Sequence, residues 1–433
     1  MKKLLLFVLV MIPALVFSGC DLELGSIESL MRPPLTATER KLDESIRRLL
    51  GSAISLRSPE SGNNHSAITL HDLDGDAKNE AIVFYANENA SSVVRMSVLK
   101  MTDTGWAIVS DFAGNGSGVY SLDFCDLNSD GCEDMLVSWY LFEDKVNKTL
   151  TVYSCIREGN QINFSACATE AYNLLHIEDV LGTGDKQIIL AYTDKSKSEP
   201  HTHVRLMQLS KDNRVIQLCK KRLDDRIIEL SSVQTDMATA SSATRVFIDA
   251  QISDKEKITE ILVWKESSNN FVSVITDINS TIRSNSLSVT DINGDGLLEI
   301  PERQVLPQST DSDVSVGCML VWNEIKGGKL VPKEYCVVNM QGNYRLSVPQ
   351  KFVGKVFVCS DNSTGHWSFK NSKNQKLFDI VIYDADDWDK HSQSVTQMLF
   401  INNNTVYACN ITQEGFAVGV TAEALTENFE INT

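Results

Sequence analysis

Acidic side chains are crowded into one short stretch of the sequence, "HDLDGDAKNEAIVFY" at residues 71–85. Four carboxylates occupy positions 1, 3, 5 and 9 of a nine-residue loop, namely Asp72, Asp74, Asp76 and Glu80. Carboxylates that converge in one tight loop repel one another unless a cation lies between them. A hard cation such as calcium takes roughly six to eight oxygen ligands, and the backbone carbonyl of Lys78 would add one. The stretch therefore predicts a calcium-binding loop.

This motif recurs at nearly constant intervals along the chain. Segments that correspond to it begin at residues 72, 126, 179, 233 and 291, so the steps are 54, 53, 54 and 58 residues. We number these nine-residue segments as the first to fifth loops. A fixed period of this length is the signature of a repeat architecture.

Two of the later loops keep the oxygen-bearing side chains. The second loop offers Asp126, Asn128, Asp130 and Asp134, and the fifth loop offers Asp291, Asn293, Asp295 and Glu299. Gly131 and Gly296 occupy position 6, where a backbone with positive φ is often needed. Ala77 replaces that glycine in the first loop, which predicts local strain.

The third and fourth loops depart from the motif. The third loop has Leu181, Thr183 and Gln187 where the others have acidic or amide ligands, and the fourth loop has lost the motif entirely. We expect both to be turns without a metal.

An EF-hand is excluded, although it begins in the same way. It needs a bidentate glutamate at position 12 and a helix after the loop. Position 12 is Val83 in the first loop and Val137 in the second, and strand-like residues surround both. Only the fifth loop has a glutamate there, Glu302, and Pro301 precedes it.

The elements that must position the loops are β-strands. Between residues 65 and 340, short apolar or alternating runs such as "AIVFY" and "QIILAYT" are separated by polar turns. Each loop has an apolar stretch before it, an apolar strand-like run follows at least four of the five loops, and two further strand-like segments complete each unit. Four strands in about 50 residues is the size of a propeller blade. The predicted fold is mainly β: a β-propeller of about five to seven four-stranded blades, followed by a small α+β domain.

The N-terminus has the features of an export signal. Lys2 and Lys3 precede an apolar run over residues 4–17, which is too short to span a bilayer comfortably. The run ends in "VFSGC", which resembles a bacterial lipobox whose Cys20 is diacylated. The alternative is an ordinary cleaved signal peptide, with Cys20 a bystander. Acylation would anchor the chain to the lipid bilayer, on the outer side of the cytoplasmic membrane.

The first, second and fifth loops resemble those of a known repeat family. "DLDGDAKNEAIVFY", "DLNSDGCEDMLVSW" and "DINGDGLLEI" are similar to the calcium loops of FG-GAP or VCBS repeats, the propeller modules of integrin-α-like proteins. With the lipobox, the chain resembles VCBS-repeat lipoproteins of Gram-positive anaerobes. The resemblance covers about residues 36–340. It implies structural calcium in the first, second and fifth loops, at the residues named above.

The predicted domains follow from these observations. They are a signal peptide (1–19), a lipid-anchored tether (20–35), a helix and lead-in (36–64), the propeller (65–341) and the C-terminal α+β domain (342–433). In the last domain we expect strands at 344–348, 355–360, 366–370, 377–383, 397–401 and 405–411, with helices near 385–395 and 421–429.

Charge and cysteine content restrict the partners and the redox state. The formal net charge of −17 becomes −19 without Lys2 and Lys3, so binding of nucleic acid by charge is excluded. Nine of the ten cysteines remain after Cys20, which predicts at least one free thiol. Cys155 and Cys167 flank a predicted hairpin, where a cross-strand disulfide and buried thiols are equally good interpretations.

No catalytic motif is present: the sequence lacks a G-x-S-x-G elbow, an H-E-x-x-H helix and a P-loop. The sequence therefore predicts that the chain is not an enzyme but a lipid-anchored, calcium-stabilised protein that binds an envelope protein or glycan. Two alternatives stay open. One is an envelope hydrolase with acids on the propeller face, and the other is a structural or assembly lipoprotein.

Overall fold

A computed structural model describes most of the chain after the predicted tether. The described residues are 37–87, 93–141, 144–159, 161–194, 201–238, 243–305, 318–339, 341–361, 366–391 and 397–431. The predicted signal peptide, Cys20 and the tether lie outside them. Among the described helices, none is long and apolar enough to cross a membrane.

The described residues form six antiparallel sheets, which we number in chain order. The first sheet contains β1 (Ile54–Leu56), β2 (Ile68–His71), β3 (Glu80–Asn87), β4 (Arg95–Thr102) and β5 (Gly105–Ala113). The second contains β6 (Gly118–Cys125), β7 (Asp134–Leu141), β8 (Asp144–Glu158) and β9 (Gln161–Tyr172). The third contains β10 (Leu174–Glu178), β11 (Gln187–Asp194), β12 (His201–Leu209) and β13 (Val215–Arg222).

The remaining sheets complete the chain. The fourth contains β14 (Glu229–Ala238), β15 (Ala243–Gln251), β16 (Glu256–Lys265), β17 (Asn270–Ser273) and β18 (Arg283–Ser284). The fifth contains β19 (Ile300–Val305), β20 (Cys318–Lys326), β21 (Lys329–Asn339), β22 (Tyr344–Ser347) and β28 (Phe429–Ile431). The sixth contains β23 (Val356–Asp361), β24 (His366–Asn371), β25 (Lys376–Asp384), β26 (Gln397–Asn402) and β27 (Thr405–Ile411).

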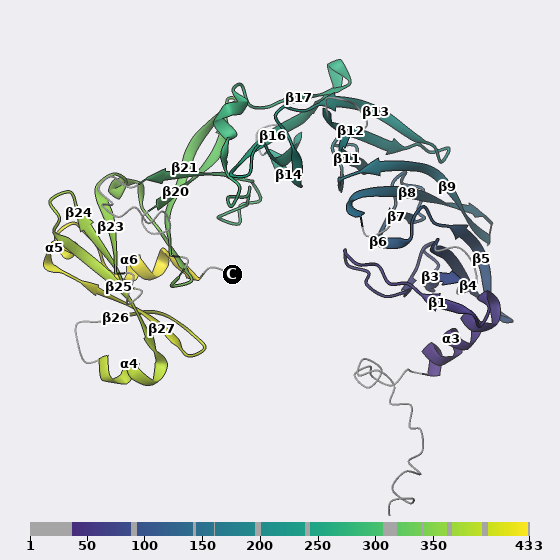
Figure 1. Ribbon diagram of the computed structural model, residues 1–433, viewed down its shortest axis with the longest axis horizontal. Helices are drawn as coiled ribbons and strands as arrows, with labels where there is room; N and C mark the ends of the chain where they lie inside the picture. Colours follow the sequence, from purple (N-terminus) through teal and green to yellow (C-terminus); the bar gives the residue numbers. More distant parts are fainter. Residues whose placement is uncertain are drawn as a thin grey trace, which may run out of the picture.

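Successive sheets stack face to face along an arc (Figure 1). We call the interface between two successive sheets a joint, and each joint has its own apolar core. Between the first and second sheets, Phe84 of β3 lies edge-on to Trp139 of β7, with their ring centroids 5.9 Å apart. Strands β3 and β7 are buried along nearly their whole length, because neighbouring elements cover both of their faces. This explains why their sequences are continuous apolar runs and not alternating ones.

The arc begins and ends with helices. Helix α3 (Ala37–Leu50) covers the outer face of the first sheet, where Leu42 and Ile46 pack against Ala81, Val83 and Leu99. A helix was predicted within residues 36–64. At the other end lie α4 (Ala385–His391), α5 (Gln413–Ala417) and α6 (Ala422–Glu427).

The prediction of a mainly β fold is confirmed. Four-stranded meanders follow one another with the predicted period, but the first and sixth sheets stand at opposite ends of the open arc (Figure 1). A closed propeller ring therefore stays a prediction. The boundary predicted after residue 341 falls inside the fifth sheet, since β22 pairs with β21 and β28 adds to β22. All six strands predicted after that boundary are present.

The cross-strand disulfide is not formed, because Cys155 and Cys167 are both free thiols. Cys155 pairs in register with Phe164, whereas Cys167 lies at a β-bulge opposite Val152 and Tyr153. Cys167 therefore lies three residues beyond the partner of Cys155, so the two cysteines are not cross-strand neighbours. Burial raises the pKa of Cys155, and the side chain that adjoins its thiol is Cys132 of the second loop.

Candidate metal-binding loops

Four of the five loops share one backbone conformation. In each, the carboxylate at position 1 accepts hydrogen bonds from the backbone N–H groups of positions 5 and 6. In the first loop these bonds join Asp72 to Asp76 (3.1 Å) and Ala77 (2.9 Å). The corresponding acceptors in the second, third and fifth loops are Asp126, Asp179 and Asp291.

The side chain at position 9 closes each loop by accepting a hydrogen bond from the backbone N–H of position 2. Glu80 accepts from Leu73 at 3.0 Å, and Asp134 accepts from Leu127 at 3.0 Å. Gln187 of the third loop does the same, with 2.8 Å between its Oε1 and the amide nitrogen of Val180. Since a loop with a neutral glutamine has the same shape, the shape alone is no evidence for a metal.

Position 6 has positive φ in all four loops, as predicted for Gly131 (83°) and Gly296 (81°). Ala77 has φ of 64° at this position, which an L-residue with a Cβ adopts only at a cost.

We expect Ala77→Gly to raise the free energy of unfolding by up to about 1 kcal/mol, measured by urea denaturation. Gly131→Ala is the matched reverse substitution and should lower it. Equal effects of both substitutions would contradict this account.

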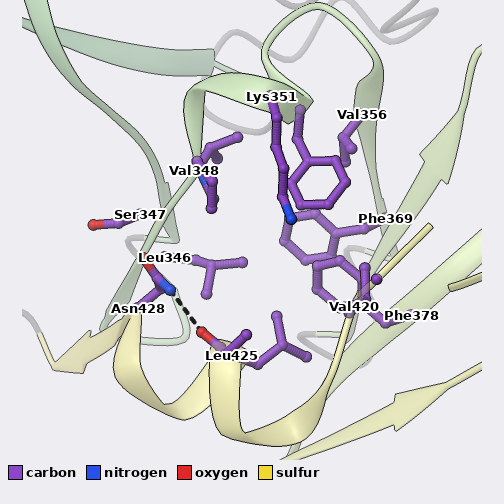
Figure 2. Close-up of a pocket in the computed structure, with 14 residues that line it drawn as sticks. Leu346, Ser347, Val348, Lys351, Val356, Phe369, Phe378, Val420, Leu425 and Asn428 are labelled. Carbon is purple, nitrogen blue, oxygen red and sulfur yellow. Dashed lines mark hydrogen bonds between the residues drawn. The ribbon is translucent and has the colours of Figure 1, made fainter. Parts of the chain in front are cut away.

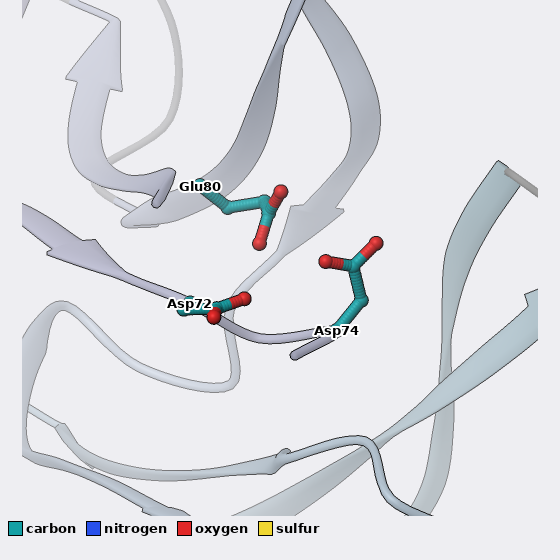
Figure 3. A group of neighbouring side chains, drawn as sticks. All are labelled: Asp72, Asp74 and Glu80. Carbon is teal, nitrogen blue, oxygen red and sulfur yellow. The ribbon is translucent and has the colours of Figure 1, made fainter. Parts of the chain in front are cut away.

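Carboxylates converge in the first loop, where Asp72, Asp74 and Glu80 point toward one another (Figure 3). One oxygen of each lies within 4.8 Å of the others. Asp74 is 5% exposed and Glu80 is fully buried, and burial raises the pKa of Glu80. Asp74 Oδ1 is buried and has no hydrogen-bond partner. A buried acceptor without a partner is costly, so this oxygen calls for a cation.

A lysine lies among these carboxylates. The Nζ of Lys100, from β4, is 2.5 Å from Asp74 Oδ2 and 3.1 Å from both Asp76 Oδ2 and Glu80 Oε1. Burial acts to lower the pKa of Lys100, but the hydrogen bonds to Asp74, Glu80 and Asp76 outweigh it and raise that pKa. Lys78, the predicted carbonyl ligand, donates its backbone N–H to Asp76 at 2.8 Å. An ammonium group therefore partly neutralises the site.

The fifth loop repeats this feature with a lysine from another strand. Lys333 of β21 bonds Asp295, and its Nζ is 2.9 Å from Glu299 Oε1. Burial raises the pKa of Glu299 despite this contact. Asn293 Oδ1 accepts from the backbone N–H of Asp295 at 3.0 Å. The two lysines reach equivalent loops from different strands, so their position is not part of the sequence repeat.

The second loop holds no such lysine: among the described residues, Asp126, Asp130 and Asp134 form no ion pair, and Glu133 of this loop bonds the ring of His71. Asp134 is fully buried, and burial raises its pKa to about 6. Asn128 is 1% exposed and donates from Nδ2 to Asn213 of the third sheet at 2.9 Å, while its Oδ1 has no partner. Asp130 accepts from the backbone N–H of Cys132 at 2.9 Å.

The fourth loop takes part in a buried ion pair in place of a cluster of carboxylates. The described part of the fourth loop, Val233–Ala238, belongs to β14. Within it, Asp236 accepts two hydrogen bonds from one edge of the Arg245 guanidinium, from Nε to Oδ1 at 2.6 Å and from Nη2 to Oδ2. Their side chains are 1% and 9% exposed. Sequence reasoning missed this pair, although an acid and a base nine residues apart across a turn are its signal.

The loops contact one another in a row. The amide of Glu133, in the second loop, donates to the carbonyl of Leu73 in the first loop at 2.8 Å. Ser129 of the second loop donates to Asp185 of the third at 2.5 Å. Leu298 of the fifth loop donates its N–H to Asp236 of the fourth at 2.8 Å. The loops are therefore joints between sheets as well as turns within them.

The oxygen donors of the first, second and fifth loops fit a hard cation. Each loop supplies four oxygen-bearing side chains, and two of the loops contain a buried acceptor without a partner. When bound, calcium would supply the positive charge that the buried carboxylates lack. In the first and fifth loops the cation must displace Lys100 or Lys333, whereas the second loop has no such competitor.

An apolar cavity of about 80 Å³ lies between the fifth and sixth sheets and α6 (Figure 2). Leu346, Phe369, Phe378 and Leu425 line it, and Lys351 lies at its edge. The volume is far below the roughly 300 Å³ of a typical ligand pocket. We interpret it as a packing gap and assign it no chemistry.

No model of a protein family matches this chain, and no curated protein matches it. The solved structures that resemble it include two rhamnogalacturonan lyases. One is a rhamnogalacturonan lyase of Bacillus licheniformis, 8% identical, covering 75% of this chain and 71% of that chain at a TM-score of 0.29. The other is the rhamnogalacturonan lyase YesW, 9% identical, covering 75% and 76% at a TM-score of 0.30.

Both structures are of enzymes, which goes against the prediction that this chain is not an enzyme. We withdraw that prediction. A likeness with these TM-scores carries no argument for any activity, so no lyase reaction is assigned to this chain.

Proposed function

We propose that this protein is a lipid-anchored, extracytoplasmic protein of the FG-GAP/VCBS propeller type that binds an envelope glycan or protein. Calcium in the first, second and fifth loops fixes the joints between its sheets. Cys20 anchors the chain in the bilayer on the outer side of the cytoplasmic membrane. The sheets hold the binding face away from that bilayer.

The observation that carries the proposal is the electrostatics of the loops. Buried oxygens of Asp74 and Asn128, at position 3 of the first and second loops, have no hydrogen-bond partner. A lone acidic turn on a surface would be solvated, but these groups are withdrawn from water. A divalent cation satisfies several such oxygens at once. Because the loops also contact each other, such a cation would stabilise the arc and not just one turn.

Calcium is therefore expected to raise the melting temperature of the protein. A cation that binds only the folded state adds about 4 kcal/mol per site at a thousandfold excess over Kd. We expect a rise of roughly 5 °C or more between chelator and calcium, measured by scanning calorimetry. The Asp74→Ala plus Asp295→Ala variant should lose most of this rise.

The matched control replaces two exposed acids outside the loops, Asp212→Ala plus Asp225→Ala, and should keep the full response to calcium. An equal calcium response in both double variants would show that calcium does not act at the first and fifth loops. No response in the unaltered protein would remove calcium from the proposal.

A further inference from the structure

A cavity of ≈ 340 Å³ opens where β6 and β10, the first strands of the second and third sheets, approach residues 61–62. Its walls include Tyr120, Asp123, Lys148 and His176. This volume is within the range of small-molecule sites. None of the predicted metal ligands lines the cavity, so it is separate from the loops.

Lys148 is the notable group of the cavity. It is 8% exposed, and its Nζ lies 4.5 Å from the ring centroid of Tyr120 and 5.4 Å from that of Tyr172. Its ammonium donates to the carbonyl of Lys145 at 3.0 Å. It makes no ion pair with a carboxylate of the described chain. Burial lowers its pKa. The carboxylate of Asp144 acts to raise this pKa but forms no ion pair with Lys148, so a buried ammonium without an anion in contact is still costly.

Asp123 lies on the wall of the same cavity but does not pair with Lys148. It is half-buried, and burial raises its pKa. A structural ion pair would bring the two charges together, whereas here Asp123 accepts from the side chain of Ser121 and Lys148 donates to a carbonyl, so neither charge meets its opposite. The other polar groups of the wall are largely used: Tyr172 donates to Ser138 at 2.6 Å, and His176 bonds Thr235 at 2.9 Å.

We infer that this cavity binds an acidic sugar, whose carboxylate pairs with Lys148 and whose hydroxyl groups donate to Asp123. A phosphate dianion would face Asp123 in a chain of net charge −17, which disfavours it. A simple carboxylic acid would offer Asp123 no donor beyond the Ser121 side chain that it already has. The inference rests on the proposed binding function and names its ligand class, but it does not require calcium.

The test is isothermal titration calorimetry of the purified full chain with sodium D-glucuronate. D-glucose lacks the carboxylate and sodium acetate lacks the hydroxyl groups, so each is expected to bind about tenfold or more weakly. Methyl glucuronide mimics a residue within a glycan. If it binds as tightly as glucuronate, the site takes glycan residues; if it binds more weakly, the site takes the free acid.

Two variants locate the site. Lys148→Met should weaken glucuronate binding about tenfold or more, and Asp123→Asn should weaken it through a change that keeps the shape of the side chain. Lys257→Met is the matched control, because Lys257 is a buried lysine on β16 outside the cavity, and it should bind as the unaltered protein does.

Absence of glucuronate binding, or equal binding of glucose, would overturn the inference. So would unchanged binding by a folded Lys148→Met variant. If Lys148→Met does not fold, unchanged binding by Asp123→Asn overturns it instead. These outcomes leave the calcium response of the protein as a separate measurement, so failure of the ligand class and failure of the calcium proposal are distinguishable.

Discussion

Lys100→Met should unfold far more readily than the unaltered protein in chelator, and calcium should restore most of the loss. The substitution removes the ammonium that lies among Asp74, Asp76 and Glu80. Glu80 is fully buried and Asp74 nearly so, which leaves their charges without a counter-charge. Removal of one member of a buried ion pair costs about 3–5 kcal/mol. Urea denaturation with and without calcium measures this free energy of unfolding.

Calcium should restore stability because it would use the oxygens that Lys100 now contacts. In the unaltered protein the ammonium and the cation compete, so Lys100→Met should also bind calcium more tightly. Lys326→Met is the control: Lys326 also pairs with a glutamate, but its side chain is 66% exposed, and a surface pair is worth about 1 kcal/mol or less. Equal destabilisation with and without calcium would mean that Lys100 alone neutralises the first loop.

The loops could be predicted from the sequence because their structure is local. The acceptor at position 1 and its donors at positions 5 and 6 lie within one turn, and the required φ at position 6 is evident from Gly131 and Gly296. The lysines could not be predicted in this way. Lys100 and Lys333 lie 26 and 38 residues from the acids they contact. Their approach depends on the register of β4 and β21.

The strands were predictable for a similar reason, and the joints between sheets were not. Apolar runs such as "AIVFY" identify a buried strand, but they do not say which sheet covers it. Closure of the sheets into a ring depends on contacts across the whole chain. The free thiol of Cys167 is a local example, since the register of β8 and β9 places it three residues beyond Phe164, the partner of Cys155.

Arg245→Met should destabilise the protein by about 3–5 kcal/mol, and here calcium should restore nothing. Arg245 lies against Asp236 with both side chains largely excluded from water. Without the guanidinium, Asp236 keeps the backbone N–H of Leu298 as a donor but loses its counter-charge. A calcium ion needs roughly six to eight oxygens, and the described part of the fourth loop offers one carboxylate. Urea denaturation in calcium and in chelator measures both effects.

A second substitution tests whether the lost charge is the cause. In Asp236→Asn plus Arg245→Met the amide oxygen still accepts from Leu298, but no buried charge remains, so the double variant should be more stable than Arg245→Met alone. If it is no more stable, the loss arises from packing of Arg245 against Phe247, whose ring centroid lies 5.3 Å from the guanidinium carbon. If calcium rescues Arg245→Met as it does Lys100→Met, calcium acts on the arc as a whole and not at individual loops. The comparison of Lys100→Met with Arg245→Met therefore separates two kinds of loop. In the first loop calcium can take the place of a lysine ammonium, whereas in the fourth loop the arginine is the permanent counter-charge.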